Sequence, residues 1–288
     1  MKLYYYVHTG HRIGLDRFRR AAAIIRALGD VDITLLTSDF RIASMAREYG
    51  IKRAVGVDVV RNIPQITHHG DKIIFDSEEI NPLMHDDMVR YFSTFVRISD
   101  NPDDTKHPGE LLVSPYLEGE GICNALAIDP RCFEPREKRI ERAFFFGDDD
   151  YEEDLAKHQE AFAGQGLELL EGFYWFLGYG EKLKETFPVR HDEEEYDEVV
   201  SGSSVLVTAS PQAALENLAA GGCPVFFQRA DYPFYYQKLF KSLNVPIVDR
   251  YDNGLLSSAL SEASSQKCHK CPQNIDKLAT FLRQNLDL

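Results

Sequence analysis

Long apolar stretches are missing from this sequence. No run approaches the roughly 20 apolar residues that a membrane-spanning helix needs. The first residues, Met1-Lys-Leu-Tyr-Tyr-Tyr-Val, read directly as a strand and lack the pattern of a signal peptide. Positive charge is also scarce, with 32 Lys and Arg against 46 Asp and Glu. A net charge of −14 would repel a phosphate backbone, so we expect no nucleic-acid partner. Because the sequence has no long apolar run and no signal-peptide pattern, we expect a cytoplasmic protein with no transmembrane segment.

Cysteine is equally sparse. The five cysteines are an odd number spread over 288 residues, which is typical of reduced thiols and not of a disulfide framework. Cys268 and Cys271 form one close pair, but a structural zinc needs four ligands, so Cys123, Cys132 or a His would have to complete the set. The alternative is an ordinary loop before the last helix. We expect no cofactor and no metal, with zinc here as the weaker hypothesis.

Several catalytic signatures are absent too. The sequence has no Gly-x-Gly-x-x-Gly after a strand, no Gly-Lys-Ser/Thr loop, no Gly-x-Ser-x-Gly elbow and no His-Glu-x-x-His. Two acidic groups, Asp76-Ser-Glu-Glu79 and His85-Asp-Asp87, resemble a metal site only superficially. Asp76 ends a predicted strand and could orient a substrate hydroxyl, whereas we interpret the other residues as a solvated acidic face.

The stretch 205–227 is the most informative part of the chain. It predicts a strand, a tight turn, a helix that starts near Ser210 or Pro211, a glycine stop at Gly221 and Gly222, and another strand. The free amide groups at such a helix start can bind a phosphate. Glu216 lies on the same helix, where its carboxylate could accept hydrogen bonds from two ribose hydroxyls. The alternative is an ordinary βαβ crossover with Glu216 in water.

Strands and helices alternate along the whole chain. Strands are expected at 2–8, 33–37, 55–59, 72–76, 95–99, 111–114, 142–147, 173–178, 205–208, 225–228 and 245–248, and helices at 15–28, 42–49, 81–91, 192–200, 235–243 and 273–284. This order predicts two α/β domains, 1–135 and 136–288, each with a mostly parallel sheet, and 116–138 as the crossing between them. Ligands of such folds bind beyond the carboxyl ends of the strands, here in a cleft between the domains.

Two motifs together carry a family resemblance. Ile13-Gly14-Leu15-Asp16-Arg17-Phe18-Arg19-Arg20 near the N-terminus, paired with Thr208-Ala-Ser-Pro-Gln-Ala-Ala-Leu-Glu216, resembles the GT-B glycosyltransferase architecture. The UDP-sugar hydrolase of the pseudaminic acid pathway is the most similar family. The resemblance implies two Rossmann-like domains, a UDP-sugar or related nucleotide-sugar ligand, cleavage at the anomeric C–O bond, and a role in bacterial surface or flagellar glycan biosynthesis.

The resemblance is uneven in the first loop. The family has a Gly and then a catalytic His where this chain has Asp16 and Arg17, although the basic pair survives as Arg19-Arg20. Asp16 could replace the missing imidazole as general base. His8 or His11 could instead reach the same water. The alternative is that both are polar loop residues.

A second departure follows the strand at 142–147. The family places small residues there, whose amides approach the diphosphate, but this chain has Gly147-Asp148-Asp149-Asp150. Three carboxylates beside a diphosphate are unfavourable unless a cation such as Mg²⁺ lies between them. The alternative, which we favour, is a solvated helix N-terminus, where acidic residues are stabilising.

The resemblance assigns the remaining site residues. Nucleotide-binding candidates are Ser210, Gln212, Glu216 and Gly147, and candidates for substrate or phosphate are Arg12, Arg17, Arg20, Asp76, Arg229 and Tyr232. A surface loop is the alternative for Arg229 and Tyr232. Two functions stay open: a nucleotide-sugar hydrolase or glycosyltransferase, and a catalytically retired protein of the same fold that serves as a binding or assembly component.

Overall fold

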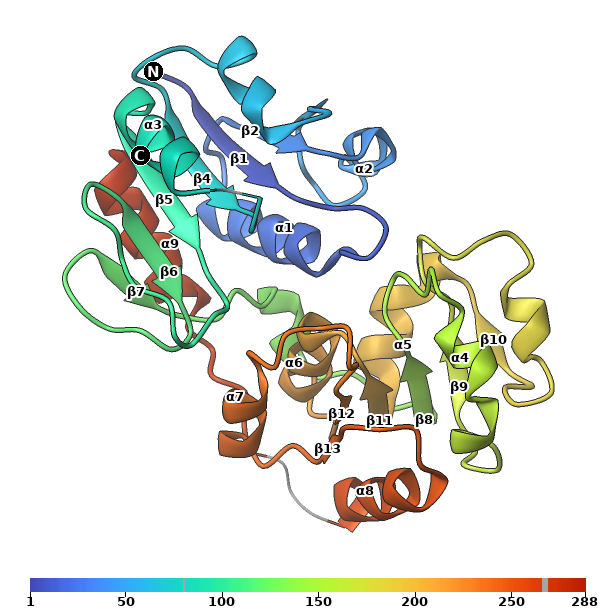
Figure 1. Cartoon of the computed structure of the whole chain (residues 1–288). Coiled ribbons are helices and arrows are strands. Elements are labelled where there is room, and N and C mark those ends of the chain that lie inside the picture. Colours follow the sequence, from blue (N-terminus) through green and yellow to red (C-terminus); the bar gives the residue numbers. More distant parts are fainter. Residues whose placement is uncertain (80, 266–268) are drawn as a thin grey trace. The chain divides into compact units, whose positions relative to one another are not determined.

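The computed structural model of the protein describes residues 1–79, 81–265 and 269–288 (Figure 1). Contacts group the chain into two compact units. Unit 1 comprises Met1–Gly10, Arg17–Pro130 and Gln273–Leu288, and unit 2 comprises His11–Asp16 and Arg131–Pro272. Among the described residues, no helix has both the length and the apolar character needed to cross a membrane.

Unit 1 is built on a seven-stranded sheet in the order β3-β2-β1-β4-β5-β6-β7. Its strands are β1 (Leu3–Val7), β2 (Ile33–Thr37), β3 (Arg53–Gly56), β4 (Lys72–Asp76), β5 (Thr94–Ile98), β6 (Leu111–Ser114) and β7 (Ile122–Asn124). All neighbouring strands pair in parallel. The parallel sheet that we predicted for this half is confirmed.

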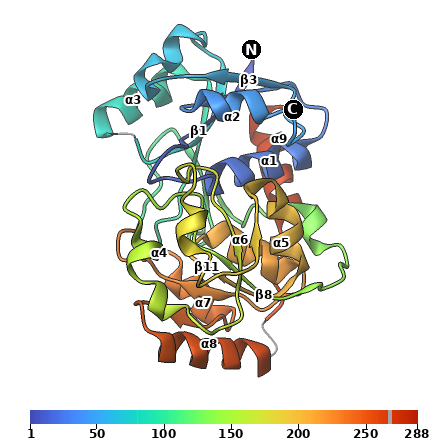
Figure 2. The ribbon, with the colours of Figure 1, turned by 90° about the vertical axis from the view of Figure 1, so that its right-hand side faces the viewer.

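Helices cover both faces of this sheet. They are α1 (Asp16–Leu28), α2 (Phe40–Met45), η1 (Val60–Gln65), α3 (Pro82–Tyr91) and α9 (Ile275–Leu286), while η2 (Pro130–Phe133) spans the boundary of the two units in the sequence. Tyr4, Tyr6 and Phe75 pack with η1 and α3 on one face. α1 and α9 lie on the face opposite to α3 (Figure 1, Figure 2). Both faces are buried, which explains the continuous apolar runs in these strands.

Unit 2 has a six-stranded parallel sheet in the order β10-β9-β8-β11-β12-β13. Its strands are β8 (Ile140–Phe145), β9 (Glu168–Leu170), β10 (Arg190–His191), β11 (Ser203–Thr208), β12 (Val225–Phe227) and β13 (Ile247–Val248). Its helices are α4 (Asp154–Lys157), η3 (Gln159–Ala161), η4 (Gly180–Leu183), η5 (Glu193–Glu195), α5 (Tyr196–Gly202), α6 (Pro211–Ala219), α7 (Gln237–Ser242) and α8 (Asn253–Ser265).

The Phe run at the end of β8 shows why this sheet is buried on both sides. Phe144 and Phe146 point to the face that packs against α8, η3 and η4. Ala143 and Phe145 point to the opposite face, against α5 and α6. Because successive side chains of a strand alternate between faces, one short apolar segment fills two cores.

Several expected elements differ from the structure. The strand expected at 173–178 is wrong, because this segment forms turns and β9 lies earlier, at Glu168–Leu170. β7 lies inside the stretch 116–138 that we interpreted as a crossing, and α8 was not predicted. The contacts place Gln273–Leu288 in unit 1 and His11–Asp16 in unit 2, which differs from a single division at residue 135. Gln273–Leu288 belongs to unit 1 because α9 packs on β7.

Candidate functional site

The start of α6 has the geometry that the sequence predicted. Ser210 is the N-cap, and its hydroxyl oxygen accepts a hydrogen bond from the Ala213 amide at 3.0 Å. Pro211 occupies the first helical turn, where backbone amides have no partner within the helix, so its missing N–H costs no hydrogen bond. The helix ends at Ala219, and Gly221 follows with φ +79°. Ser210 and Gln212 are both buried at the carboxyl edge of the sheet of unit 2.

A carboxylate of the chain already occupies this helix start. The Ser210 hydroxyl donates to Asp16 Oδ1 at 2.6 Å, and the backbone amide of Gln212 donates to Asp16 Oδ2 at 3.3 Å. The helix start therefore binds an anion, as its dipole and free amides predict. In this structure the anion is Asp16, from the segment His11–Asp16 of unit 2.

Glu216 is buried two turns further along α6, with 6% of its surface exposed. Gln212 Nε2 donates to its Oε1 at 2.8 Å, and the Tyr196 hydroxyl donates to its Oε2 at 2.9 Å. The alternative that Glu216 faces water is wrong. These two hydrogen bonds orient the Glu216 carboxylate.

The Asp148–Asp150 turn is buried and not solvated, which corrects our favoured interpretation. All three aspartates are at most 4% exposed. Asp150 accepts hydrogen bonds from the Asp154 and Leu155 amides at 2.8 and 3.0 Å, so it caps the start of α4. It also accepts from the Tyr179 hydroxyl at 2.5 Å. A buried carboxylate is stable here because the surrounding donors replace its water.

The other two aspartates hold the segment His11–Asp16. Asp148 Oδ2 accepts from the Leu15 amide at 2.9 Å, and Asp149 Oδ2 accepts from the Arg12 amide at 3.0 Å. His11 Nδ1 lies 2.8 Å from Asp149 Oδ1. The acidic turn of this chain therefore binds backbone amides of its own N-terminal loop. The sequence alone did not indicate this partner.

Gly147 makes the turn between β8 and these aspartates. Its φ of +118° is a conformation that residues with a side chain rarely adopt. The facing Gly172 is also required, since a Cβ there would lie 2.4 Å from the Gly147 carbonyl oxygen. The role of Gly147 in nucleotide binding stays a prediction.

Arg229 lies at the end of β12 and is 4% exposed, so the surface-loop alternative is wrong for it. Its Nη1 donates to the Asp149 carbonyl at 2.7 Å, and the guanidinium pairs with Asp231 at 2.8 and 3.0 Å. The guanidinium carbon lies 4.4 Å from the ring centroids of both Phe146 and Tyr232. Burial lowers the pKa of Arg229, but the hydrogen bonds to Asp231 and the charges of Tyr232, Asp231 and Asp150 together outweigh burial and raise it overall. Arg229 thus brings a fixed positive charge beside the Asp149 turn.

Comparison with protein families and with curated protein sequences finds no match. Solved structures do match over nearly the whole chain. Staphylococcus aureus MnaA in complex with UDP has a TM-score of 0.65, 10% identity, and coverage of 100% of this chain and 98% of that chain. Anabaena HepE in complex with UDP has a TM-score of 0.59 and 10% identity, with coverage of 99% of this chain and 96% of that chain. The glycosyltransferase SnogD from Streptomyces nogalater has a TM-score of 0.54 and 16% identity, with coverage of 100% of this chain and 95% of that chain. The chain has the GT-B fold of two Rossmann-like domains.

The remaining site candidates of this GT-B protein lie in unit 1, around Asp76. Arg20 pairs with Asp76 through two hydrogen bonds of 2.6 and 2.9 Å, and the Tyr5 hydroxyl donates to the same carboxylate at 3.2 Å. Arg17 Nε lies 3.7 Å from Asp76 Oδ1. His8 Nδ1 lies 3.4 Å from the Glu79 carboxylate, and burial lowers the pKa of His8. Asp76 therefore neutralises much of the positive charge that we assigned to phosphate binding.

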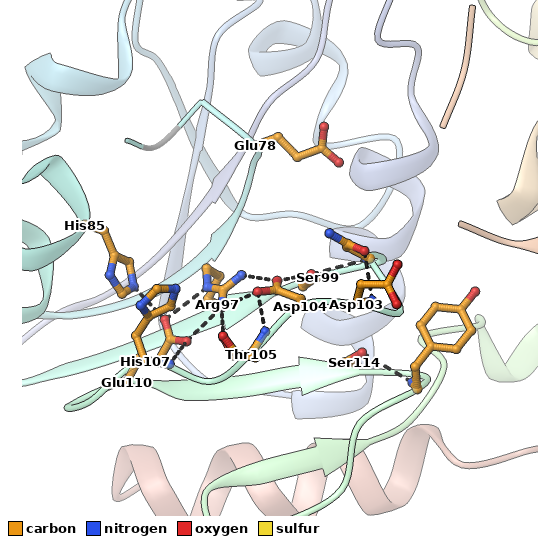
Figure 3. Close-up of polar contacts among 12 residues, drawn as sticks. Glu78, His85, Arg97, Ser99, Asp103, Asp104, Thr105, His107, Glu110 and Ser114 are labelled. Carbon is orange, nitrogen blue, oxygen red and sulfur yellow. Dashed lines mark hydrogen bonds and ion pairs between the residues drawn. The ribbon is translucent and has the colours of Figure 1, made fainter. Parts of the chain in front are cut away.

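His85 was wrongly interpreted as part of a solvated acidic face. It is 5% exposed, and its Nε2 lies 2.6 Å from Glu110 Oε2 (Figure 3). Arg97 binds the same carboxylate through two hydrogen bonds of 2.8 and 3.0 Å and also pairs with Asp104. Burial raises the pKa of Glu110, but the hydrogen bonds and charge of Arg97, together with hydrogen bonds from the His107 amide and His85, outweigh burial and lower the pKa overall. This network fastens the 99–110 connection to the sheet of unit 1.

The described residues bear on only part of the zinc hypothesis, which stays untested. Cys268 lies outside the described residues, and burial raises the pKa of the Cys271 thiol to about 12, which disfavours the thiolate that zinc needs. In residues 1–79, 81–265 and 269–288, no group of three or more His, Cys, Asp or Glu side chains is arranged to hold a metal ion. Mg²⁺ beside the Asp148–Asp150 turn stays a prediction for titration.

Proposed function

We propose that this GT-B protein binds a nucleotide-sugar, with UDP-sugars as the expected class, and acts at the anomeric C–O bond as a hydrolase or glycosyltransferase. The observation that carries the proposal is the start of α6, where the Ser210 hydroxyl and the Gln212 amide hold a carboxylate at 2.6 and 3.3 Å. A ligand phosphate would make the same hydrogen bonds. Glu216, on the same helix, is oriented to accept hydrogen bonds from ribose hydroxyls.

The comparisons support this ligand class. Two of the matching structures, from S. aureus and Anabaena, are complexes with UDP. Their 10% identity to this chain relates the folds only, so UDP enters here as part of the proposal. The family resemblance of the two motifs extends it to bacterial surface or flagellar glycan biosynthesis.

His11 is the general base that the geometry favours among His8, His11 and Asp16. Its Nδ1 donates to the Asp149 carboxylate at 2.8 Å, which fixes the ring and leaves Nε2 as the proton acceptor. Its side chain is 42% exposed, so water can reach Nε2. A base oriented by a carboxylate is the arrangement that proton abstraction from water requires.

One observation favours the second function, a catalytically retired binding or assembly component. Asp16 fills the anion site of α6, and Asp148 and Asp149 are satisfied by the amides of Leu15 and Arg12. In this arrangement the Ser210 hydroxyl and the Gln212 backbone amide are already engaged, so a nucleotide would have to displace Asp16. The two functions make opposite predictions for nucleotide binding.

Isothermal titration of UDP and UDP-N-acetylhexosamine, with and without Mg²⁺, separates them. We expect micromolar binding by the wild type and at least about tenfold weaker binding by Glu216→Gln, which keeps the side-chain shape but not the charge. Glu198→Gln is the matched control, because Glu198 is exposed on the neighbouring α5. No heat for either nucleotide would reject the enzyme and favour the retired protein.

An activity assay then tests His11. Release of free sugar from UDP-N-acetylhexosamine should fall at least about a hundredfold in His11→Gln, with the dissociation constant for UDP nearly unchanged. Unchanged release in this variant would exclude His11 as the base and return the role to Asp16 or His8.

A further inference from the structure

Unit 1 contains a cavity of about 690 Å³ at the amino-terminal edge of its sheet. Tyr4 of β1, Thr34 of β2 and Arg53 of β3 are register partners, and all three line it. Arg47, just after α2, belongs to its wall, and α2 lies beside β2 and β3 (Figure 1). This edge is opposite to the carboxyl ends of the same strands, and the cavity belongs to a different unit from the α6 site.

The cavity is basic in an acidic protein. Lys2, Arg47, Lys52 and Arg53 line it, and among the residues that the structure describes no Asp or Glu belongs to its lining. The whole chain has 46 acidic against 32 basic residues, so composition alone predicts more carboxylates than cations in any such lining. A cavity wall of one sign concentrates counter-ions of the other sign.

Two of these cations are already paired, and two are not. Lys52 pairs with Asp30, and Arg53 pairs with Asp32, each at 3.2 Å. Asp71 is near Lys2, but it binds the Lys2 backbone amide and not the ammonium. Within the described residues, the Lys2 ammonium and the Arg47 guanidinium have no carboxylate at ion-pair distance. Their charges are available to a ligand.

The remainder of the lining is hydroxyl and apolar. Thr34 and Ser44 supply hydroxyl groups, while Ile51, Val55 and Ile66 supply apolar surface. An organic group attached to a phosphate could contact this apolar surface. The volume is typical of a small-molecule site.

We propose that this cavity binds a small phosphate-bearing molecule that carries at least two negative charges. Arginine presents a planar fork that matches phosphate oxygens, and a second cation nearby selects a dianion over a singly charged carboxylate. The proposal is independent of the nucleotide-sugar function, because no residue of the α6 site takes part in it.

Titration calorimetry with pyrophosphate and with citrate, at about 0.15 M salt, where distant charges are screened, tests the proposal. The wild type should bind pyrophosphate, and Arg47→Glu should weaken this binding at least about tenfold, whereas Arg47→Lys, which keeps the charge but not the planar fork, should weaken it less. Arg61→Glu is the matched control, since Arg61 is exposed in η1, outside the cavity lining, and its replacement changes the net charge equally.

The contradicting results are distinct from those for the α6 site. Equal pyrophosphate affinity in Arg47→Glu and Arg61→Glu would show that pyrophosphate binds elsewhere and would overturn the proposal. Citrate binding as tight as that of pyrophosphate would overturn the assignment to phosphate. UDP binding that depends on Glu216 but not on Arg47 leaves the two sites separate, as proposed.

Discussion

Replacing Asp16 by Asn tests whether the chain competes with its own ligand. Asp16 accepts hydrogen bonds from the Ser210 hydroxyl and the Gln212 amide, the donors that we assign to a nucleotide phosphate. Asn has the same shape and can still accept from Ser210, but it carries no charge. The substitution therefore changes the electrostatics of the α6 start with little change in packing.

The expected gain in affinity follows from the Asp16 contacts. An anion at a partly buried helix start is stabilised by up to about 2 kcal/mol, which a nucleotide must overcome when it displaces Asp16. If Asp16 stays nearby, two unit charges about 4 Å apart repel by about 4 kcal/mol at an effective dielectric constant of about 20. We expect Asp16→Asn to bind UDP about 10- to 100-fold more tightly, which corresponds to about 1.4 to 2.8 kcal/mol.

The same change should lower stability. Without a ligand, the α6 start loses its charged partner, so the free energy of unfolding should fall by about 0.5 to 2 kcal/mol. Calorimetric titration with UDP and urea unfolding of the unliganded protein measure the two effects. Opposite changes in UDP affinity and stability are the signature of an internal competitor.

Asp197→Asn provides the control, because Asp197 is an exposed residue of α5 in the same unit and its replacement changes the net charge equally. Unchanged or weaker UDP binding in Asp16→Asn would refute the idea that Asp16 competes with the phosphate. Tighter binding with loss of sugar release would instead identify Asp16 as the general base.

Three further substitutions test the rest of the structure. Arg97→Met should lower the free energy of unfolding at pH 7 by about 3 to 5 kcal/mol in urea unfolding, because it leaves Glu110 charged and buried. Since Arg97 holds the pKa of Glu110 below its unfolded value, this wild-type advantage should disappear as the pH falls through the folded pKa. Burial lowers the pKa of Lys138 to about 8 from 10.5, so Lys138→Met should be more stable than the wild type at pH 7, and the difference should shrink as the pH rises from about 8 to 10.5. Gly147→Ala should lower the melting temperature through a backbone strain of about 1 to 3 kcal/mol, whereas Gly202→Ala, at a position with open space, should not.

The sequence predicted the regular parts of the fold well. Alternating apolar strands and helices indicated parallel sheets, and Ser210 with Pro211 located the start of α6 within one residue. The errors have physical causes. The aromatic run at 173–178 has high strand propensity, but its residues form turns beside the close contact of Gly172 with Gly147. α8 is rich in Ser and weakly periodic, so its apolar stripe was not recognised.

The site was harder to predict because its partners are distant in sequence. Glu216 was recognised as a functional candidate, but nothing in its spacing shows that Tyr196 and Gln212 bind its two oxygens. For Asp148 and Asp149 the sequence indicated either charges that repel a diphosphate or a solvated helix start. In the structure Asp148 accepts from the Leu15 amide, 133 positions upstream, and Asp149 accepts from the Arg12 amide, 137 positions upstream. A local pattern identifies a helix start or a turn, whereas only the folded chain decides which donor meets which acceptor.

The acidic turn and the loop His11–Asp16 therefore have to be interpreted together. A turn with small residues would leave backbone amides available to a diphosphate. Here Asp149 accepts a hydrogen bond from the Arg12 amide and also orients His11. The same carboxylate that disfavours a nearby phosphate thus positions the imidazole that we propose as the base. If Asp149→Asn tightens UDP binding and abolishes sugar release together, both roles belong to this one side chain, and the departure from the family motif is a change in how the site works and not its loss.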